Sequence, residues 1–154
     1  MTQFGDLYSQ YYDLLNSNKD YKAEVDFVNT LIRENSINVK TLLDMGCGTG
    51  AHAEIFCDKG YKVHGIDLSK EMLKIAKTRQ KGKEENLTFS HSSIQDLNLN
   101  KKFDAIISLF HVMSYQNSNN ELIKAFEVAK NHLKKGGIFI FDFWYGPAVL
   151  TDLP

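Results

Sequence analysis

The segment TLLDMGCGTG, residues 41–50, constrains the fold more than any other part of the chain. A short apolar run leads into three alternating glycines, Gly46, Gly48 and Gly50. Glycines let a backbone turn tightly and approach a ligand closely, because no side chain intervenes. Asp44 precedes the first glycine by two positions, and its charge would repel a phosphate docked on the following helix. The segment therefore predicts a strand–loop–helix unit whose ligand accepts a nearby carboxylate.

Strand-like and helix-like segments alternate along the remainder of the chain. We expect strands at 40–46, 61–68, 86–93, 103–110 and 138–144, and helices at 20–35, at 50–60, from Ser69 onward, and from Asn119 or Asn120 to a stop at Gly136-Gly137. Apolar runs such as FDAIISLF are typical of parallel strands covered on both faces. The pattern predicts a doubly wound, Rossmann-like α/β fold with a parallel sheet of about five strands. Ligands of such sheets bind beyond the carboxyl ends of the strands.

Length and composition limit the classes of function. The 154 residues suit one domain, with a helical N-terminal part (1–36) and a sheet core (40–145). A net charge of -1 gives no basic surface for nucleic acid, and no apolar run approaches the ~20 residues of a membrane helix. Cys47 and Cys57 form no cluster with histidines, so no metal site is expected. Unpaired cysteines and the absence of a signal-peptide pattern favour the cytoplasm.

The glycine loop allows two cofactor classes. GCGTGA fits the pattern G-x-G-x-x-G/A, and Asp67 follows about 20 residues later, where a ribose-binding acid is expected, so an NAD(P)-binding oxidoreductase is one alternative. Asp44 opposes it, because a carboxylate repels a pyrophosphate. A better ligand carries a nucleoside for Asp67 and a positive group for Asp44. S-adenosylmethionine has both, with no phosphate between them.

The residues LLDMGCGTG followed by VHGIDLS resemble the cofactor motifs of class I S-adenosylmethionine-dependent methyltransferases, and the resemblance extends over about residues 40–145. It implies that the loop from Asp44 to Gly50, including Cys47, holds the methionine part of the cofactor. It further implies that Asp67 accepts hydrogen bonds from both ribose hydroxyls, and that Leu68 and Met72 pack near the adenine.

One position departs from the family pattern. After the third strand, the family often carries an acid that contacts the adenine amino group, whereas this chain has Ser93, followed by Ile94. A serine hydroxyl still accepts a hydrogen bond. We therefore expect Ser93 and Ile94 at the adenine and Asp96 as a loop cap.

The methyl-transfer side is expected after the fourth strand, in SLFHVMSY. Leu109, with Ser108 and Phe110, should border the cofactor. His111 is a candidate general base, since imidazoles titrate near neutral pH, but a packed histidine without a chemical role is equally consistent. The other histidines, His52, His64, His91 and His132, are expected to be structural.

Two aromatic segments are candidates for the walls of this side. In FGDLYSQYYDLL, the rings of Tyr8, Tyr11 and Tyr12 are candidates to contact the sulfonium by cation–π attraction, with Tyr12 also near the reacting groups. The alternative is plain packing of an N-terminal helix. In DFWYGP, residues Asp142, Trp144 and Tyr145 are expected at the acceptor mouth.

These segments are similar to those of small-molecule methyltransferases, including enzymes that act on sugars and amino sugars. The resemblance implies methyl transfer to a hydroxyl or amino group of a small acceptor, and a non-catalytic S-adenosylmethionine-binding fragment is a further alternative. Family members usually continue past the fifth strand with an antiparallel pair of strands, which this sequence lacks. We therefore expect a C-terminally truncated chain whose exposed sheet edge favours a homodimer.

Overall fold

The computed structural model describes residues 6–35 and 38–151, without the side chains of 6–10, 148, 149 and 151. Its strands are β1 (Thr41–Met45), β2 (Lys62–Asp67), β3 (Leu87–His91), β4 (Phe103–Ser108) and β5 (Leu133–Phe141). Its helices are α1 (Asp6–Leu15), α2 (Tyr21–Asn35), α3 (Ala51–Asp58), α4 (Lys70–Arg79), the 3-10 helix η1 (Val112–Tyr115), α5 (Asn119–His132) and α6 (Gly146–Thr151).

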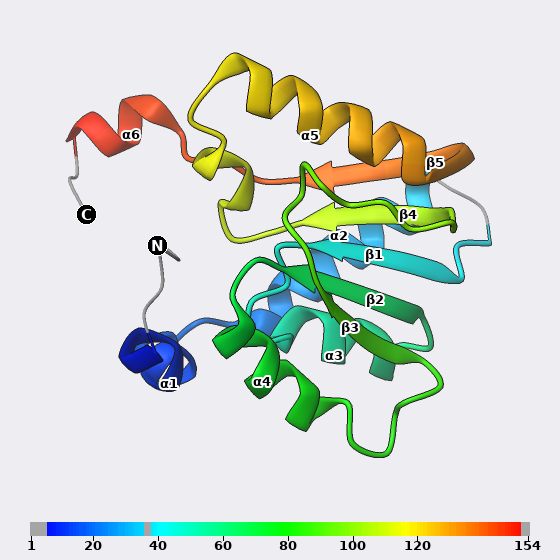
Figure 1. Cartoon of the computed structure of the whole chain (residues 1–154), viewed down its shortest axis with the longest axis horizontal. Helices are drawn as coiled ribbons and strands as arrows, with labels where there is room; N and C mark the ends of the chain where they lie inside the picture. Colours follow the sequence, from blue (N-terminus) through cyan, green and yellow to red (C-terminus); the bar gives the residue numbers. More distant parts are fainter. Residues whose placement is uncertain (1–5, 36–37, 152–154) are drawn as a thin grey trace.

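The strands form one sheet in the order β3-β2-β1-β4-β5, and every strand pair among the described residues is parallel. The predicted Rossmann-like α/β fold is therefore confirmed. The strand order reverses between β1 and β4, which makes the carboxyl ends of these central strands the switch point where ligands bind. α1 and α6 both lie at this end of the sheet (Figure 1).

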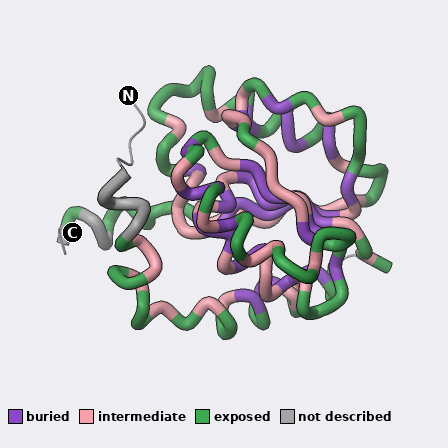
Figure 2. Tube along the Cα trace, turned by 60° about the horizontal axis from the view of Figure 1, so that its bottom comes forward, coloured by how far each residue is buried: buried purple, intermediate pink, exposed green. Residues whose placement is uncertain are grey.

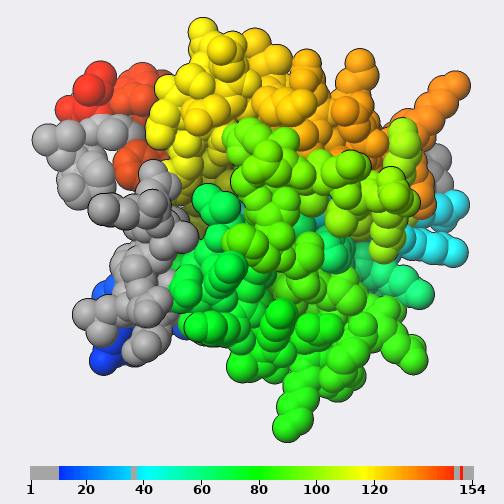
Figure 3. Space-filling model, viewed as in Figure 1, coloured from blue at the N-terminus to red at the C-terminus, as the bar shows by residue number. Residues whose placement is uncertain are grey.

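The sheet is covered on both faces, as its apolar strands require. On one face, α2 and α3 pack Val25, Ile32 and Phe56 against sheet residues such as Leu42 and Ile107. On the other face, α5 and the segment after β3 pack Ala125, Val128, Ile94 and Leu97 against neighbours such as Leu43 and Ile106. The buried residues concentrate in the strands between these layers (Figure 2). In the space-filling view, the segment after β3 meets the surface of α5 (Figure 3).

Serine caps start two helices. Ser69 Oγ accepts a hydrogen bond from Met72 N at 3.2 Å, which is the half capping box that the sequence indicates. α5 begins at Asn119, as predicted, and its cap is Ser118, which forms a complete capping box with Glu121. Each such cap satisfies backbone N–H groups that have no partner inside the helix.

The C-terminal boundary of α5 differs from the prediction. The helix ends at His132, and β5 begins at Leu133 and contains the expected stop, Gly136-Gly137. The reason is an irregular pairing with β4, in which the register moves from Phe103↔Leu133 to Ala105↔Ile138. Residues 134–137 lie between these pairs, and a Cβ at Gly137 would come within 2.8 Å of Asp104 O. The glycines thus serve a bulge in the strand, not the end of a helix.

Three further features concern partners and chemistry. No helix within the described ranges has both the length and the apolar character needed to cross a membrane. Over the same residues, no group of three or more His, Cys, Asp or Glu side chains is placed to hold a metal ion. Cys47 and Cys57 are both free thiols.

Candidate functional site

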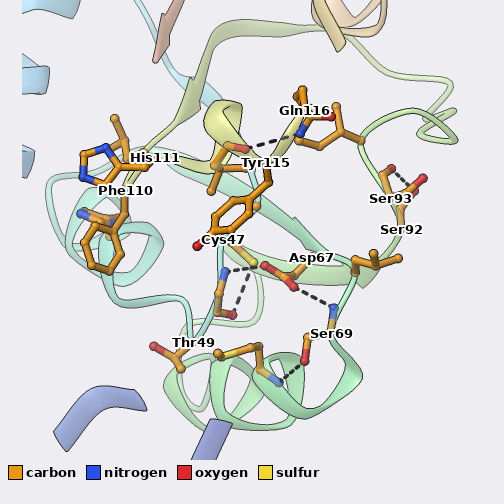
Figure 4. Close-up of a pocket in the computed structure, with 18 of the residues that line it drawn as sticks. Cys47, Thr49, Asp67, Ser69, Ser92, Ser93, Phe110, His111, Tyr115 and Gln116 are labelled. Atoms are coloured by element: carbon orange, nitrogen blue, oxygen red, sulfur yellow. Dashed lines mark hydrogen bonds between the residues drawn. The ribbon is translucent and has the colours of Figure 1, made fainter. Parts of the chain in front are cut away.

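A cavity of about 620 Å³ lies at the carboxyl ends of β1, β2 and β4. This volume is in the range of small-molecule and cofactor sites. Phe110 and His111 lie at one end of the cavity and Ser92 and Ser93 at the other, with Asp67 between them (Figure 4). The cavity therefore has two ends of different chemistry, joined at the glycine loop and at the end of β2.

The glycine loop turns tightly and is tied to β2. The backbone N–H groups of Gly46 and Cys47 both donate to Ile66 O at 2.9 Å. Gly46, Gly48 and Gly50 all have positive φ, at 84°, 53° and 78°. A Cβ at Gly46 would lie 2.5 Å from Val112 Cγ1, whereas one at Gly48 would meet nothing within 4 Å. Gly46 is thus required by packing, and Gly48 presents bare backbone beside the cavity.

Asp67, at the end of β2, holds this loop in place. Its Oδ2 accepts from Gly48 N and its Oδ1 from Ser69 N, both at 2.8 Å. Burial raises the pKa of the Asp67 carboxyl, and the N–H groups of Ser69 and Gly48 oppose that rise. Each carboxylate oxygen can accept more than one hydrogen bond, so the side chain can also receive hydroxyl groups from a ligand in the cavity.

Asp44 occupies a different position from Asp67. It is 2% exposed, lies in β1 and does not line the cavity. Its Oδ2 is buried and has no hydrogen-bond partner among the described residues. Burial, with a further contribution from the charge of Asp67, raises the pKa of Asp44 to about 7. A buried carboxyl in this state is ready to pair with a cation, and its predicted role toward the methionine part stays a prediction.

The expected adenine end is mainly apolar. Leu68, Met72, Ser93 and Ile94 all line the cavity, and Met72 and Ile94 are buried. Ser93 Oγ donates to Asp96 Oδ2 at 2.6 Å and accepts from Asp96 N at 3.1 Å. The Ser93 hydroxyl is thus used largely within its own loop, and Asp96 holds that loop.

Two amides that the sequence analysis missed also line this end. Gln95, after β3, donates through its side-chain nitrogen to Gln116 Oε1, just past η1. The pair connects two walls of the cavity that are 21 residues apart in the chain. No motif indicates either residue, because the contact depends on how the segments after β3 and β4 meet in space.

The N-terminal tyrosines separate in the structure. Tyr12 lines the cavity, and its ring packs edge-on against Phe110 with centroids 6.3 Å apart. Tyr11 is 51% exposed and does not line it, and the side chain of Tyr8 lies outside the described residues.

An ion-pair network fastens α1 to the glycine loop. Asp13 accepts from Thr49 Oγ1 and from an Arg79 guanidinium nitrogen, both at 2.6 Å. Arg79 Nε donates to Thr49 O at 2.9 Å. Through this network, α1 is held beside the loop and Tyr12 is held over the cavity.

His52 and Tyr21 also line the cavity, although His52 was expected to be structural only. His52 Nε2 lies 2.8 Å from Glu24 Oε2, and this hydrogen bond, with help from Lys19, lowers the pKa of Glu24 to about 2. The ring of Tyr21 packs edge-on against His52 at 4.8 Å. The available signal was the place of His52 in the first turn of the helix that follows the glycine loop.

The other end of the cavity is aromatic. Leu109, Phe110, His111, Tyr115 and Trp144 line it. The imidazole of His111 packs edge-on against Trp144 at 5.6 Å, and its Nδ1 is buried without a hydrogen-bond partner among the described residues.

Three residues expected at this end lie outside the cavity wall. Ser108 is fully buried and donates to Met45 O at 2.8 Å, and Tyr145 is 69% exposed. Asp142 lies behind the wall and accepts from the backbone of Phe110 and His111.

The remaining predicted cofactor residues sit as follows. Gly46, Cys47 and Gly48 line the cavity, whereas Gly50 packs internally, where a Cβ would lie 2.8 Å from Phe89 Cζ. Burial raises the pKa of the Cys47 thiol, so the group stays neutral and presents a small apolar surface.

The residues present fit S-adenosylmethionine. Bare backbone at Gly48 and the Asp67 carboxylate suit a ribose, and the apolar surface of Leu68, Met72 and Ile94 suits an adenine. The partnerless Oδ2 of Asp44 suits a nearby cation. A pyrophosphate would instead face the Asp67 carboxyl group, with Asp44 buried nearby, and no lysine or arginine is among the cavity-lining residues.

Comparisons with known proteins agree with this geometry. Residues 42–137 match the family model described as a methyltransferase domain. The chain is 32% identical over 147 residues to dTDP-3-amino-3,4,6-trideoxy-alpha-D-glucopyranose N,N-dimethyltransferase of Streptomyces venezuelae, covering 96% of this chain and 60% of the relative. The chain therefore belongs to the methyltransferase domain family.

Solved structures give the same assignment. An S-adenosylmethionine-dependent methyltransferase from Clostridium acetobutylicum superposes with a TM-score of 0.77 at 35% identity, covering 86% of this chain and 54% of that one. An S-adenosylmethionine-bound amino pentose methyltransferase from Micromonospora echinaspora gives a TM-score of 0.80 at 28% identity, covering 96% and 60%. The chain thus spans 54% to 60% of these proteins, and the matches do not favour the nicotinamide-dinucleotide alternative.

Proposed function

We propose that this chain binds S-adenosylmethionine and belongs to an enzyme that methylates an amino group of a small molecule, with an amino sugar as the favoured acceptor. The observation that carries the proposal is Asp67, held by Gly48 N and Ser69 N in a cavity with an apolar end and an aromatic end. The relatives that act on amino sugars support the acceptor class. A hydroxyl acceptor is the second candidate, favoured by the same cavity.

Each part of the cavity has a role in this proposal. Asp67 accepts the ribose hydroxyls, while Leu68, Met72 and Ile94 enclose the adenine, with Ser93 beside it. The loop Gly46–Cys47–Gly48 lies along the methionine part, and Leu109 borders the centre. Asp44 supplies negative charge toward the ammonium group from inside β1. Gly50 acts by closing the loop against Phe89, and Tyr11 is the predicted residue with the least support from its position.

For methyl transfer, the chain must align the acceptor with the methyl group and exclude water from the site. When bound, S-adenosylmethionine supplies an activated methyl group on a sulfonium. Tyr12, Phe110 and Trp144 then form the walls that orient an acceptor and exclude water. His111, whose ring reaches this end, is placed to accept the proton that an amine loses as it is methylated. Tyr12 contributes its ring beside the reacting groups.

Organisation and assembly are part of the proposal. We infer that residues 1–154 form a single cofactor-binding domain in which α1 caps the cavity. β5 forms an edge of the sheet, and its Phe139 and Phe141 pack against Phe126 of α5. A homodimer that covers this edge is expected, with analytical ultracentrifugation as its test; a monomer at high micromolar concentration contradicts it. Location in the cytoplasm and a lack of nucleic-acid partners stay predictions.

The function is tested in two steps. Calorimetry compares S-adenosylmethionine, S-adenosylhomocysteine and NADH; binding of the first two supports the proposal, and binding of NADH alone overturns it. Mass spectrometry then looks for a gain of one or two methyl groups on nucleotide-linked amino sugars and their hydroxyl analogues. Cofactor binding without any methylated product favours the non-catalytic alternative for this chain.

A further inference from the structure

The turn that follows β4 has an unusual backbone. Phe110 and His111 both have positive φ, at 65° and 62°, and the side chains of both line the cavity. Left-handed backbone is unfavourable for a non-glycine residue, and bulky residues rarely adopt it. Two such residues in succession persist only where the surroundings hold them, and such strain gathers at functional sites.

Asp142 is the group that holds this turn. Its Oδ2 accepts from Phe110 N at 3.0 Å and its Oδ1 from His111 N at 2.6 Å. Consecutive N–H groups in this kind of backbone point to one side and form a concave anion-binding surface. Asp142 N in turn donates to Ser108 O at 3.3 Å, which fixes the aspartate beside the end of β4. One carboxylate thus satisfies both donors of the strained turn.

The turn determines where two cavity side chains point. Nδ1 of His111 has no hydrogen-bond partner among the described residues, so no such bond orients the ring through this atom. The neighbouring Trp144 contacts the imidazole edge-on. The Phe110 ring packs edge-on against Tyr12, and the ammonium of Lys19 lies 4.0 Å from its centroid. The direction of the two rings therefore depends on these ring contacts together with the backbone that Asp142 holds.

We propose that Asp142 is a positioning residue for the methyl-transfer side: its carboxylate clamps the Phe110–His111 turn and thereby aims the His111 imidazole and the Phe110 ring into the cavity. The role of the two side chains in methyl transfer rests on the proposed function. The hydrogen bonds between Asp142 and the turn do not depend on it. Asp142 touches neither end of the cavity directly and acts through the turn.

Asp104 offers a matched control. Its Oδ2 accepts backbone N–H groups of Lys40 and Thr41 at 3.1 and 2.9 Å, so it performs the same kind of clamp. It lies at the opposite end of β4, away from the cavity-lining residues. Asp142→Asn and Asp104→Asn each remove the charge of a carboxylate that accepts two backbone N–H groups, and Asp104 accepts in addition from Thr41 Oγ1 and Lys134 Nζ. Only the first variant should alter the site.

The test uses nuclear magnetic resonance of the whole chain and needs no turnover. In the unaltered protein, scalar couplings across the hydrogen bonds should join the amides of Phe110 and His111 to the Asp142 carboxyl carbon; their absence overturns the inference. In Asp142→Asn, the amide signal of His111 should move upfield and its ring signals should shift, whereas in Asp104→Asn both should stay in place. Unmoved His111 signals in a folded Asp142→Asn variant also overturn it.

Kinetics separates this inference from the proposed function. With an acceptor identified as above, Asp142→Asn should lower kcat at least about tenfold, the scale of a misaligned site, and alter the pH profile, with the cofactor KM within about twofold. Asp142→Glu should recover part of the loss relative to Asp142→Ala. If the unaltered chain binds no S-adenosylhomocysteine, the proposed function fails, while the resonance test of the clamp remains decisive.

Discussion

Two aspartates at carboxyl ends of strands, Asp67 as the last residue of β2 and Asp142 directly after β5, perform the same task for two different parts of the cavity. Each gives its two carboxylate oxygens to two backbone N–H groups. Asp67 holds a loop of glycines, in which positive φ has no steric cost. Asp142 holds Phe110 and His111, for which the same backbone is strained.

The difference teaches how the two halves of the site are specified. On the cofactor side, the glycines leave parts of the loop without side chains, so the backbone can approach the ligand directly. On the acceptor side, the side chains are the binding surface, and the backbone must be held in a costly shape to present them. The first side is therefore built from a local motif, and the second from a contact between residues 31 and 32 positions apart.

The largest expected effect tests the glycine side. Gly46→Ala adds a Cβ at φ 84° and 2.5 Å from Val112 Cγ1. Strain and overpacking together should lower the free energy of unfolding by about 2–5 kcal/mol, measured by urea denaturation. Gly60→Ala is the control, since its φ of 95° is similar but its Cβ would meet nothing within 4 Å. Equal losses in the free energy of unfolding of the two variants would show that Val112 moves aside and that the loop is not tightly packed.

A second prediction concerns Asp44, the carboxyl with no partner on its Oδ2. Because burial raises its folded pKa to about 7, the folded state holds a proton that the unfolded state releases at lower pH. Its contribution to stability is therefore present at low pH and is lost as pH rises from about 4 through 7. Relative to the unaltered chain, Asp44→Asn should gain on the order of 2–4 kcal/mol between pH 5 and pH 8 in urea denaturation. Parallel pH curves for the two proteins would contradict this.

A third prediction concerns the ligand of Asp67. Asp67→Ala removes a charged hydrogen-bond acceptor and should weaken S-adenosylhomocysteine binding by at least ~1–3 kcal/mol in calorimetry. The control is Asp26→Ala, which removes an exposed carboxylate of α2 that does not line the cavity, and its affinity should stay within about twofold. An unchanged affinity for Asp67→Ala would place the ribose elsewhere.

The smallest expected effect concerns the fastening of α1. Asp13→Asn keeps one acceptor oxygen but removes the charge that pairs with Arg79. A partly exposed ion pair contributes up to about 1 kcal/mol, so amide exchange in residues 11–15 should quicken by about two- to fivefold. The control is Asp26→Asn, which breaks the exposed ion pair between Asp26 of α2 and Lys59. Amide exchange in α1 should stay unchanged in this variant. Faster exchange in both variants would point to general loosening.

The comparison also explains what could be predicted from the sequence. The sheet, its parallel strands and the place of Asp67 follow from local patterns, because each pattern and its partners lie within one or two elements. The places of Met72 and Ile94 were expected from the resemblance to the methyltransferase family. Gln116 and His52 were missed as cavity residues because their positions depend on how separate loops meet. The start of β5 was misplaced because a glycine pair has the same appearance at a helix end and in a bulge.

The network around Asp13 has a consequence for how the chain assembles. The partners of Asp13 are Thr49 and Arg79, which follow it by 36 and 66 residues. α1 can therefore dock only after α3 and α4 have taken their places on the sheet. During synthesis on a ribosome, the segment around Asp13 emerges before its partners do, so it must wait unpaired until about half of the chain has been made. We expect α1 to be the latest of these three helices to gain protection when the denatured chain refolds.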